Sequence, residues 1–320
     1  MAVADTIFTY GPANVTSLLA TTFSKYSKNM ADNIFQQIPL LAFLALKNQV
    51  TESGGATLVR PIVYAKNSTA AAYASDDILD TSIQDLFTAA QWQWRQYAAS
   101  ITIPGRIERQ NSGDSQVIDY VTAQIQTAEL SLKDKLNGDL WASSQTGSKI
   151  TPIQAVVSNT GTVGDINGGT QTWWQSTTIA SGSFAARGLS DMRSAWNQTN
   201  VRNPIGPVDF IISDRTSYEA YEATIVPQLR LGDTKKGDLG FENFTYKSAV
   251  WTFDPVAASG TIFLLNSRCL ELVQHSRTQF ALSEWTKPAN QDLKVAQILW
   301  MGELTTNNRR KMAYLTGVTA

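Results

Sequence analysis

The chain has 320 residues, of which 43% are hydrophobic and only 17% are charged, against about 25% charged residues in typical soluble domains. Its 26 Lys and Arg nearly balance its 27 Asp and Glu, which disfavours nucleic-acid binding as the main activity, since phosphate contacts need an excess of basic residues. The single cysteine, Cys269, excludes an intramolecular disulfide and a multi-cysteine metal site, and it is typical of a reducing compartment.

Residues 1–52 are expected to form an N-terminal arm. Apolar residues at helical spacing predict a short amphipathic helix that begins near Asn14, and a second apolar segment, residues 38–44, is interrupted by Pro39. Neither segment can form a core alone, so the arm should lie across the body of its own chain or of a neighbour. The chain shows no signal-peptide pattern and no run of about 18 apolar residues, so we expect a cytoplasmic protein without a membrane span.

Residues 53–104 are predicted to form an extended β-hairpin. One strand should cover residues 58–64, and a longer strand, rich in Trp, Tyr and Ile, should cover residues 87–103. The connection between them, residues 66–84, is rich in Ala, Ser and Asp and has little capacity to form a core. A hairpin of this length is not stable without support, so we expect it to rest on another subunit.

The longer strand changes its apolar face halfway along. Trp92 and Trp94 share one face, whereas Tyr97, Ile101 and Ile103 share the other. The strand therefore contains a bulge or passes from one packing environment to another, and we favour the second interpretation. This segment and the preceding connection supply the predicted inter-subunit contact residues, which are Trp92, Trp94, Tyr97, Phe87 and Lys66.

Residues 114–143 are predicted to form one long amphipathic helix, about 45 Å in length at 1.5 Å per residue. Its apolar stripe consists of Val117, Val121, Ile125, Ala128, Leu132, Leu136 and Leu140. Breaker residues flank this span, and Glu129 and Lys133 stand four apart in the favourable order for an ion pair. The regular stripe indicates a structural element rather than a catalytic site.

The rest of the chain predicts helices in the middle and strands at the end. A polar, Gly-rich loop over residues 148–183 should precede a helix at 184–198, a buried strand at 208–213 and a helix at 216–224 that stops before Pro227. Short strands are expected over residues 249–253, 261–265, 269–274, 279–285, 295–304 and 310–315. This order indicates an α+β protein rather than an alternating parallel α/β one.

Candidate sites for chemistry are few. The single histidine, His275, would have to serve any Ser/His/Asp machinery, and the chain contains no Gly-x-Ser-x-Gly motif. The Gly-rich stretch at residues 164–170 lacks the Lys of a phosphate-binding loop and the remaining ligands of a calcium loop. We therefore predict no catalytic residue, cofactor or metal site, and a hydrolase that uses His275 is only a remote alternative. A basic cluster, Arg309, Arg310 and Lys311, could contact the phosphates of DNA or pair with carboxylates such as Glu303 or those of a neighbouring subunit.

The order of these elements resembles that of the major capsid protein of tailed bacteriophages, which has the Hong Kong 97 fold. The segments that carry the resemblance are residues 208–214 (VDFIISD) leading into Tyr218, 249–254 (AVWTFD), 260–263 (GTIF), 302–304 (GEL) and 314–318 (YLTGV). The resemblance covers nearly the whole chain. It implies an N-terminal arm at 1–52, an extended loop at 53–104, a peripheral domain at 105–199 that contains the spine helix 114–143, an axial domain at 200–285, and the C-terminal strands of the peripheral domain at 286–320.

The resemblance also implies a function and partners. Members of this family assemble as hexamers and pentamers into an icosahedral shell around double-stranded DNA, with a portal and usually a scaffold. It implies a virion capsid assembled in the host cytoplasm, a separate scaffolding protein and, as an optional partner, a decoration protein. Some members cross-link a loop Lys to an Asn of a neighbour, but no pattern around Lys66 marks that reaction, and we predict none. An encapsulin-like compartment shell with the same fold is the alternative.

Overall fold

The computed structural model describes residues 38–47, 49–52, 54–110, 120–201, 205–232 and 244–319. Most of the predicted N-terminal arm and positions 114–119 of the predicted long helix lie outside these ranges. The chain divides into two units. The described residues of the first unit fall within 98–133 and 280–299, and those of the second unit fall within 38–97, 134–279 and 300–319.

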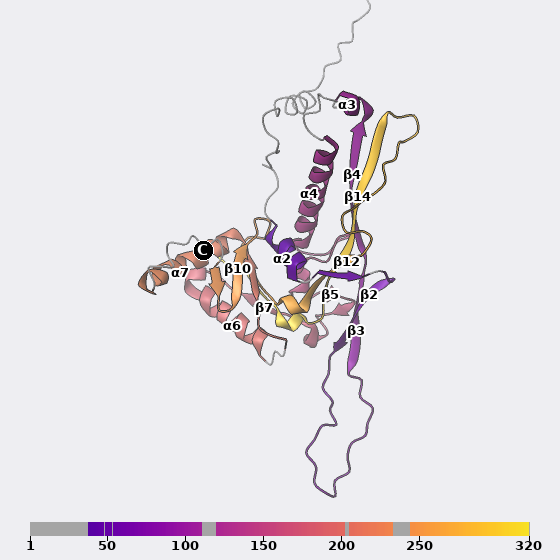
Figure 1. Ribbon diagram of the computed structural model, residues 1–320. Helices are drawn as coiled ribbons and strands as arrows, with labels where there is room; N and C mark the ends of the chain where they lie inside the picture. The colour runs from indigo at the N-terminus through magenta and orange to yellow at the C-terminus, as the bar shows by residue number, and fades with distance from the viewer. Residues whose placement is uncertain are drawn as a thin grey trace, which may run out of the picture. The chain divides into compact units, whose positions relative to one another are not determined.

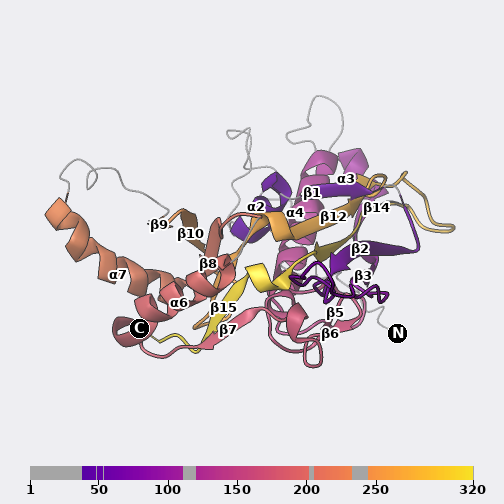
Figure 2. The same cartoon turned by 90° about the horizontal axis from the view of Figure 1, so that it is seen from below.

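The main sheet of the second unit has six strands in the order β7-β15-β11-β8-β10-β9. Figure 2 labels all of these strands except β11. These strands are β7 (Thr177–Ala180), β8 (Phe210–Ser213), β9 (Phe244–Tyr246), β10 (Ala249–Phe253), β11 (Ile262–Leu265) and β15 (Ala313–Thr316). Strand β8 lies parallel to β10 and antiparallel to β11. Every residue of β8 and β11 is buried, as expected for central strands of a sheet that is covered on its faces.

Two helices, α6 (Leu189–Asn200) and α7 (Arg215–Gly232), lie beside this sheet (Figure 1). Met192 and Trp196 of α6 are four residues apart, so they point from one helix face into the core that the sheet lines. The side chain of Trp251 stacks on Tyr221 with 4.1 Å between ring centroids, and its indole N–H donates to Ser213 Oγ at 2.9 Å. Aromatic side chains from both helices and the sheet thus form one continuous core.

The boundaries of both helices differ from the sequence prediction. A π-helical turn, η4 (Phe184–Gly188), occupies the start of the helix predicted at 184–198, and α6 begins at Leu189. The predicted stop before Pro227 is wrong, because α7 continues to Gly232. A proline removes one backbone hydrogen bond and can kink a helix, but the remaining bonds allow the helix to resume.

The N-terminal apolar segment forms helix α2 (Pro39–Lys47). Pro39 does not interrupt it, because proline is favoured in the first turn of a helix, where its missing N–H would have no partner in any case. Leu40 and Leu44 are fully buried, and the ring of Phe43 stacks on Phe210 with 3.9 Å between centroids. This helix therefore belongs to the core of the second unit.

A second sheet contains five strands: β1 (Gln49–Glu52), β4 (Arg95–Pro104), β12 (Leu270–His275), β13 (Ala281–Leu282) and β14 (Leu293–Thr306). In the second unit, β1 lies parallel to β12, and β12 pairs in antiparallel fashion with residues 302–306 of β14. In the first unit, β13 pairs with residues 298–299 of β14. Strand β4 also pairs with β14.

The predicted hairpin is confirmed as β2 (Thr57–Val63) paired with β3 (Phe87–Gln93). Residues 64–86 connect the two strands and extend away from them as a long loop (Figure 1). Strand β3 ends at Gln93 and β4 begins at Arg95, so Trp94 alone separates them. Because β3 pairs with β2 whereas β4 pairs with β14, the change of apolar face marks a passage between two packing environments.

The predicted long helix is confirmed over the described residues as α4 (Tyr120–Leu140). Leu132, Leu136 and Leu140 of the predicted stripe are buried, and Glu129 and Lys133 form an ion pair at 2.7 Å. The helix ends three residues earlier than the predicted position 143, with Ala142 N–H bonded to the carbonyl of Asp139 in a tighter turn. No helix of the described residues is long and apolar enough to span a bilayer.

Short elements complete the two units. In the second unit these are α5 (Ile153–Val156), β5 (Thr162–Val163), β6 (Ile166–Asn167) and the 3-10 turns η3 (Thr172–Trp174), η5 (Ser267–Cys269) and η6 (Arg309–Lys311). The first unit contains α3 (Gly105–Gln110), a helix the sequence pattern did not predict. Two ion pairs, Arg109 to Asp292 at 2.6 Å and Lys294 to Glu108 at 2.5 Å, join α3 to the segment around β14.

Candidate assembly surface

The β2–β3 hairpin and its connecting loop expose large apolar side chains to solvent. The residues of this apolar loop set are each more than half exposed: Val63, Tyr73, Ile78, Leu79, Ile83 and Phe87. Ile78 and Ile83 are fully exposed, and Val63 and Phe87 are paired in register where the hairpin ends. Burying one such side chain is worth about 1.5–3 kcal/mol, so this set is a strong candidate for contact with another protein surface.

Local polar contacts shape the loop. Asn67 Oδ1 accepts hydrogen bonds from the backbone N–H and the hydroxyl of Thr69, and Asp77 Oδ2 accepts one from Ala74 N–H at 2.7 Å. The hydroxyl of Ser68 donates to Gln84 Oε1 at 2.7 Å, which links the two sides of the loop. These contacts define turns but bury little apolar surface, so the loop leaves its large side chains available to a partner.

Of the predicted contact residues, Phe87 and Lys66 lie on this exposed loop surface. Trp92 does not, and its assignment to an inter-subunit contact is corrected. The side chain of Trp92 is 5% exposed and belongs to a core cluster that includes Leu58 and Trp174. The register places Leu58 directly opposite Trp92, so both point to the covered face of the hairpin.

Trp94 and Tyr97 are half-buried and hydrogen-bonded within their own chain. The indole N–H of Trp94 donates to the carbonyl of Gly55 at 2.9 Å. The hydroxyl of Tyr97 donates to Asp139 Oδ2 at 3.1 Å and accepts from Ile150 N–H at 2.9 Å. Burial raises the pKa of the Tyr97 hydroxyl, which therefore stays protonated. The hydroxyl of Tyr97 thus has partners within its own chain, and a contact of its ring with another subunit stays a prediction.

The basic cluster is divided by the fold. It forms the turn η6 rather than part of the strand predicted at 310–315, because Asn308 Oδ1 caps the turn by accepting from Arg310 N–H. Arg310 is exposed, whereas the ammonium of Lys311 donates to the carbonyl of Val201 at 2.9 Å. Glu303 pairs with Arg95 and not with this cluster.

Arg309 is corrected from a surface charge to a core residue, since its side chain is fully buried. Its Nε donates to the carbonyl of Val156 at 2.8 Å, and its Nη2 donates to those of Ala155, Ser158 and Thr160 at 3.0, 2.7 and 3.4 Å. Burial lowers the pKa of this guanidinium to about 10, which leaves it charged at neutral pH. Arg309 therefore organises the backbone around α5 and cannot reach DNA.

The geometry around His275 does not support the hydrolase alternative. His275 is the last residue of β12, and its Nδ1 accepts a hydrogen bond from Arg277 N–H at 3.2 Å. In a catalytic triad the same nitrogen donates to a carboxylate. No group of three or more His, Cys, Asp or Glu in the described part of the chain could hold a metal ion.

Ile78, Leu79 and Ile83 are contact candidates that the sequence pattern did not predict. Their connection is rich in Ala, Ser and Asp, and this average composition concealed the three large aliphatic residues. Their presence in a segment without apolar periodicity was the available signal, because a polar loop has no core in which such side chains could be buried.

Neither a family model nor a curated protein sequence matches this chain. Solved structures do. The capsid asymmetric unit of cyanophage A-1(L) superposes with a TM-score of 0.70 at 14% identity, covering 92% of this chain and 97% of that one. The capsid of Myoviridae phage XM1 gives a TM-score of 0.59 at 12% identity, with 91% and 95% of the two chains covered.

An encapsulin is also similar. The SrpI encapsulin of Synechococcus elongatus PCC 7942 gives a TM-score of 0.54 at 11% identity and covers 94% of this chain and 95% of its own. At these identities the likeness is one of fold, and it extends over nearly the full length of each chain. The chain therefore has the Hong Kong 97 fold that these capsid and encapsulin subunits share.

Proposed function

We propose that this chain is the major capsid protein of a tailed bacteriophage, which assembles as hexamers and pentamers into an icosahedral shell around double-stranded DNA. The observation that carries the proposal is the apolar loop set on the hairpin of a chain with a capsid fold. A hairpin that exposes six large apolar side chains on its loop and strand ends is costly in an isolated protein and useful in one that is covered by copies of itself.

Closed symmetry explains how modest contacts would suffice. In a shell every subunit repeats the same contacts with its neighbours, so many weak interactions act together and none has to be strong. The low content of charged residues supports this arrangement, because the centre of a protein interface is depleted in charge. The apolar loop set would supply such contacts, and the acidic residues beside it, Asp76 and Asp77, would restrict which surface it accepts.

The proposed shell would enclose DNA without sequence-specific binding. The formal net charge of −1 offers no large excess of cations, and Arg309 is buried within its own subunit. A separate scaffolding protein and a portal are the further partners we propose, with a decoration protein as an optional one. The virion capsid, assembled in the host cytoplasm, is the proposed location.

Electron microscopy tests the proposal directly. The full-length chain would be produced alone and together with a scaffolding protein, and the products would be separated by size and imaged. We expect closed icosahedral particles or capsomer rings in at least one of these preparations. A protein that stays monomeric at high concentration under every assembly condition would overturn the proposal.

An encapsulin-like compartment is the second candidate, and the similarity to SrpI favours it. The two functions differ in what the particle contains. Particles purified from the native source should hold double-stranded DNA if the chain is a phage capsid protein, and an enzyme cargo if it forms a compartment. Nuclease treatment of opened particles, followed by mass spectrometry of the remaining proteins, distinguishes these outcomes.

A further inference from the structure

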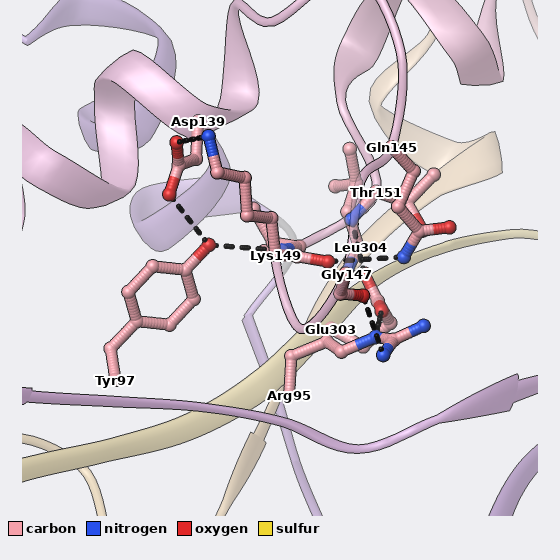
Figure 3. Close-up of polar contacts among 10 residues, drawn as sticks. Arg95, Tyr97, Asp139, Gln145, Gly147, Lys149, Thr151, Glu303 and Leu304 are labelled. Atoms are coloured by element: carbon pink, nitrogen blue, oxygen red, sulfur yellow. Dashed lines mark hydrogen bonds and ion pairs between the residues drawn. The ribbon is translucent and has the colours of Figure 1, made fainter.

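A buried glutamate lies where the hairpin strands meet the second sheet. Glu303 of β14 is 1% exposed, and its Oε1 accepts hydrogen bonds from the backbone N–H groups of Thr151 at 2.7 Å and of Leu304 at 2.9 Å (Figure 3). Its Oε2 lies 3.4 Å from Arg95 Nε. The two oxygens thus have different partners, two neutral donors on one and a single cation on the other.

Arg95 occupies the joint between two strands. It follows Trp94, the residue that separates β3 from β4, and its Nη1 also donates to the carbonyl of Gly147 at 3.2 Å. The contact between Arg95 and Glu303 therefore connects β14 to the start of β4, and Gly147 is a second partner of Arg95.

A second polar network lies beside the first. Asp139, at the end of α4, accepts from Tyr97 Oη and from the ammonium group of Lys149, each at 3.1 Å (Figure 3). The ammonium group of Lys135 also donates to Asp139 at 3.1 Å. Burial opposes the charge of Asp139, but the hydrogen bonds from Lys135 and Lys149 outweigh it and lower the pKa of Asp139. The Asp139 carboxylate therefore stays charged near neutral pH, and its hydrogen bonds supply a fixed frame for the Glu303 contact.

A polar cavity of about 220 Å³ opens next to Glu303. Its lining includes Arg95 and Glu303 together with Gln91, Gln145 and Thr151. The cavity is large enough for several water molecules and offers them polar partners. Water in this space would give the buried carboxyl a route for exchanging its proton.

The charge of the Glu303 carboxyl depends on the balance between its burial and its polar neighbours. Burial raises the pKa of Glu303 to about 7, and the hydrogen bonds from Thr151 and Leu304 and the charge of Arg95 offset this effect only in part. The long distance of 3.4 Å to Arg95 is consistent with incomplete compensation.

We propose that Glu303 and Arg95 form a pH-dependent ion pair, here called the tie, which links β14 to the position where β3 ends and β4 begins. When Glu303 is a carboxylate, it holds Arg95 and the tie is closed. When Oε2 takes up a proton, the ion pair is lost, Arg95 stays on Gly147 or turns into the cavity, and the tie is open. The two backbone bonds to Oε1 persist in both states, so the change is confined to the Arg95 side.

The charged groups around Glu303 favour it as the group that titrates. Strand β4 presents Arg95 and the hydroxyl of Tyr97, whose raised pKa keeps it neutral. The turn between β5 and β6 presents Asp165 at the cavity, and the segment after α4 presents Lys149, which is paired with Asp139. On β12 the residue opposite Glu303 is Val273, which carries no charge.

Hydrogen exchange of the full-length chain at pH 6 and pH 8 tests the tie. The carboxylate fraction of a group with a pKa near 7 falls about tenfold between pH 8 and pH 6. After correction for the intrinsic rate, we therefore expect amide protection in residues 94–97 to be up to about tenfold lower at pH 6. Amides of the buried strand β11 should be unchanged, and equal protection of residues 94–97 at both pH values would overturn the proposal.

Two substitutions make the test specific. Glu303→Gln keeps an oxygen for the backbone donors but cannot ionise, so residues 94–97 should show the low protection of pH 6 at both pH values. Arg95→Gln removes the cation from the same contact and should abolish the pH difference as well, which gives an answer even if the first variant fails to fold. A pH difference that persists in either folded variant would assign the titration to another group and contradict the proposal.

Discussion

At the scale of single residues, burial separates neighbours that the sequence presents as equivalent. Arg309 and Arg310 are adjacent, yet the first is fully buried and the second is exposed. The Arg309 side chain donates to the backbone carbonyls of Val156, Ala155 and Ser158, and its guanidinium lies over the ring of Trp174. A buried arginine of this kind contributes to the stability of the subunit, whereas an exposed one can serve assembly or DNA contact.

Substitution of these two arginines should therefore have unequal effects. We expect Arg309→Ala to lower the free energy of unfolding by about 3 kcal/mol or more, because it removes several buried hydrogen bonds to backbone carbonyls and opens a cavity. The matched control, Arg310→Ala, should change it by less than about 0.5 kcal/mol. Urea denaturation followed by tryptophan fluorescence measures both, and equal midpoints for the two variants would contradict the assignment of Arg309 to the core.

The burial of Arg309 could not be predicted from the sequence. Its partners lie about 150 positions earlier in the chain, so no local pattern distinguishes it from Arg310. Trp92 was misassigned for the same reason, because its partner Trp174 comes from a distant loop. Burial of a polar or aromatic side chain depends on tertiary contacts that periodicity does not encode.

At the scale of elements, the sequence was a better guide, because both α4 and the β2–β3 hairpin could be predicted from it. A stripe of leucines at helical spacing predicts a helix and its buried face, and alternation predicts paired strands. The element ends were less accurate, since α7 continues through Pro227 and β15 begins only at Ala313. Ends depend on single capping contacts, such as the side chain of Asn308, rather than on a repeated pattern.

The two faces of α4 allow a direct test of its stripe. Leu132 is 3% exposed, whereas Leu130, two residues earlier, is 36% exposed. We expect Leu132→Asp to lower the free energy of unfolding by about 3 kcal/mol or more, because it places an unpaired charge in the core. Leu130→Asp, the control with the same chemical change, should lower it by less than about 1 kcal/mol. Thermal melts monitored by circular dichroism compare the two, and similar melting temperatures would show that the stripe is not the buried face.

The hairpin loop is the element on which the proposed assembly depends. We expect the double variant Ile78→Ser with Ile83→Ser to keep the melting temperature of the free subunit, because both side chains are fully exposed. Assembly should be strongly reduced, since two large apolar contacts are lost from every copy in the shell. Sedimentation of assembly reactions measures this, with Ala70→Ser and Ala72→Ser in the same loop as controls. Normal particle yield from the isoleucine variant would remove this loop from the interface.

At the scale of the whole molecule, a low content of charged residues and an exposed apolar loop are both features of a subunit whose surface is buried in an assembly. Most single-chain proteins place their large aliphatic residues in their own core, and the core clusters around Trp251 and around Trp92 show that this chain does so as well. The apolar loop set remains outside both clusters. Under the proposed function a second copy of the chain covers it.

Limited proteolysis of free and assembled protein tests that conclusion on the unmodified sequence. Lys66 is exposed and is the only basic residue between Arg60 and Arg95, so trypsin has one cleavage site within the loop. We expect rapid cleavage after Lys66 in free subunits and strong protection in particles, because a loop covered by a neighbour cannot enter the protease. Mass spectrometry identifies the fragments cut after Lys66. A Lys66→Gln variant, which lacks the cleavage site, serves as the control and should not yield them. Cleavage at the same rate in particles and free subunits would show that the loop stays uncovered and that the shell is held together elsewhere.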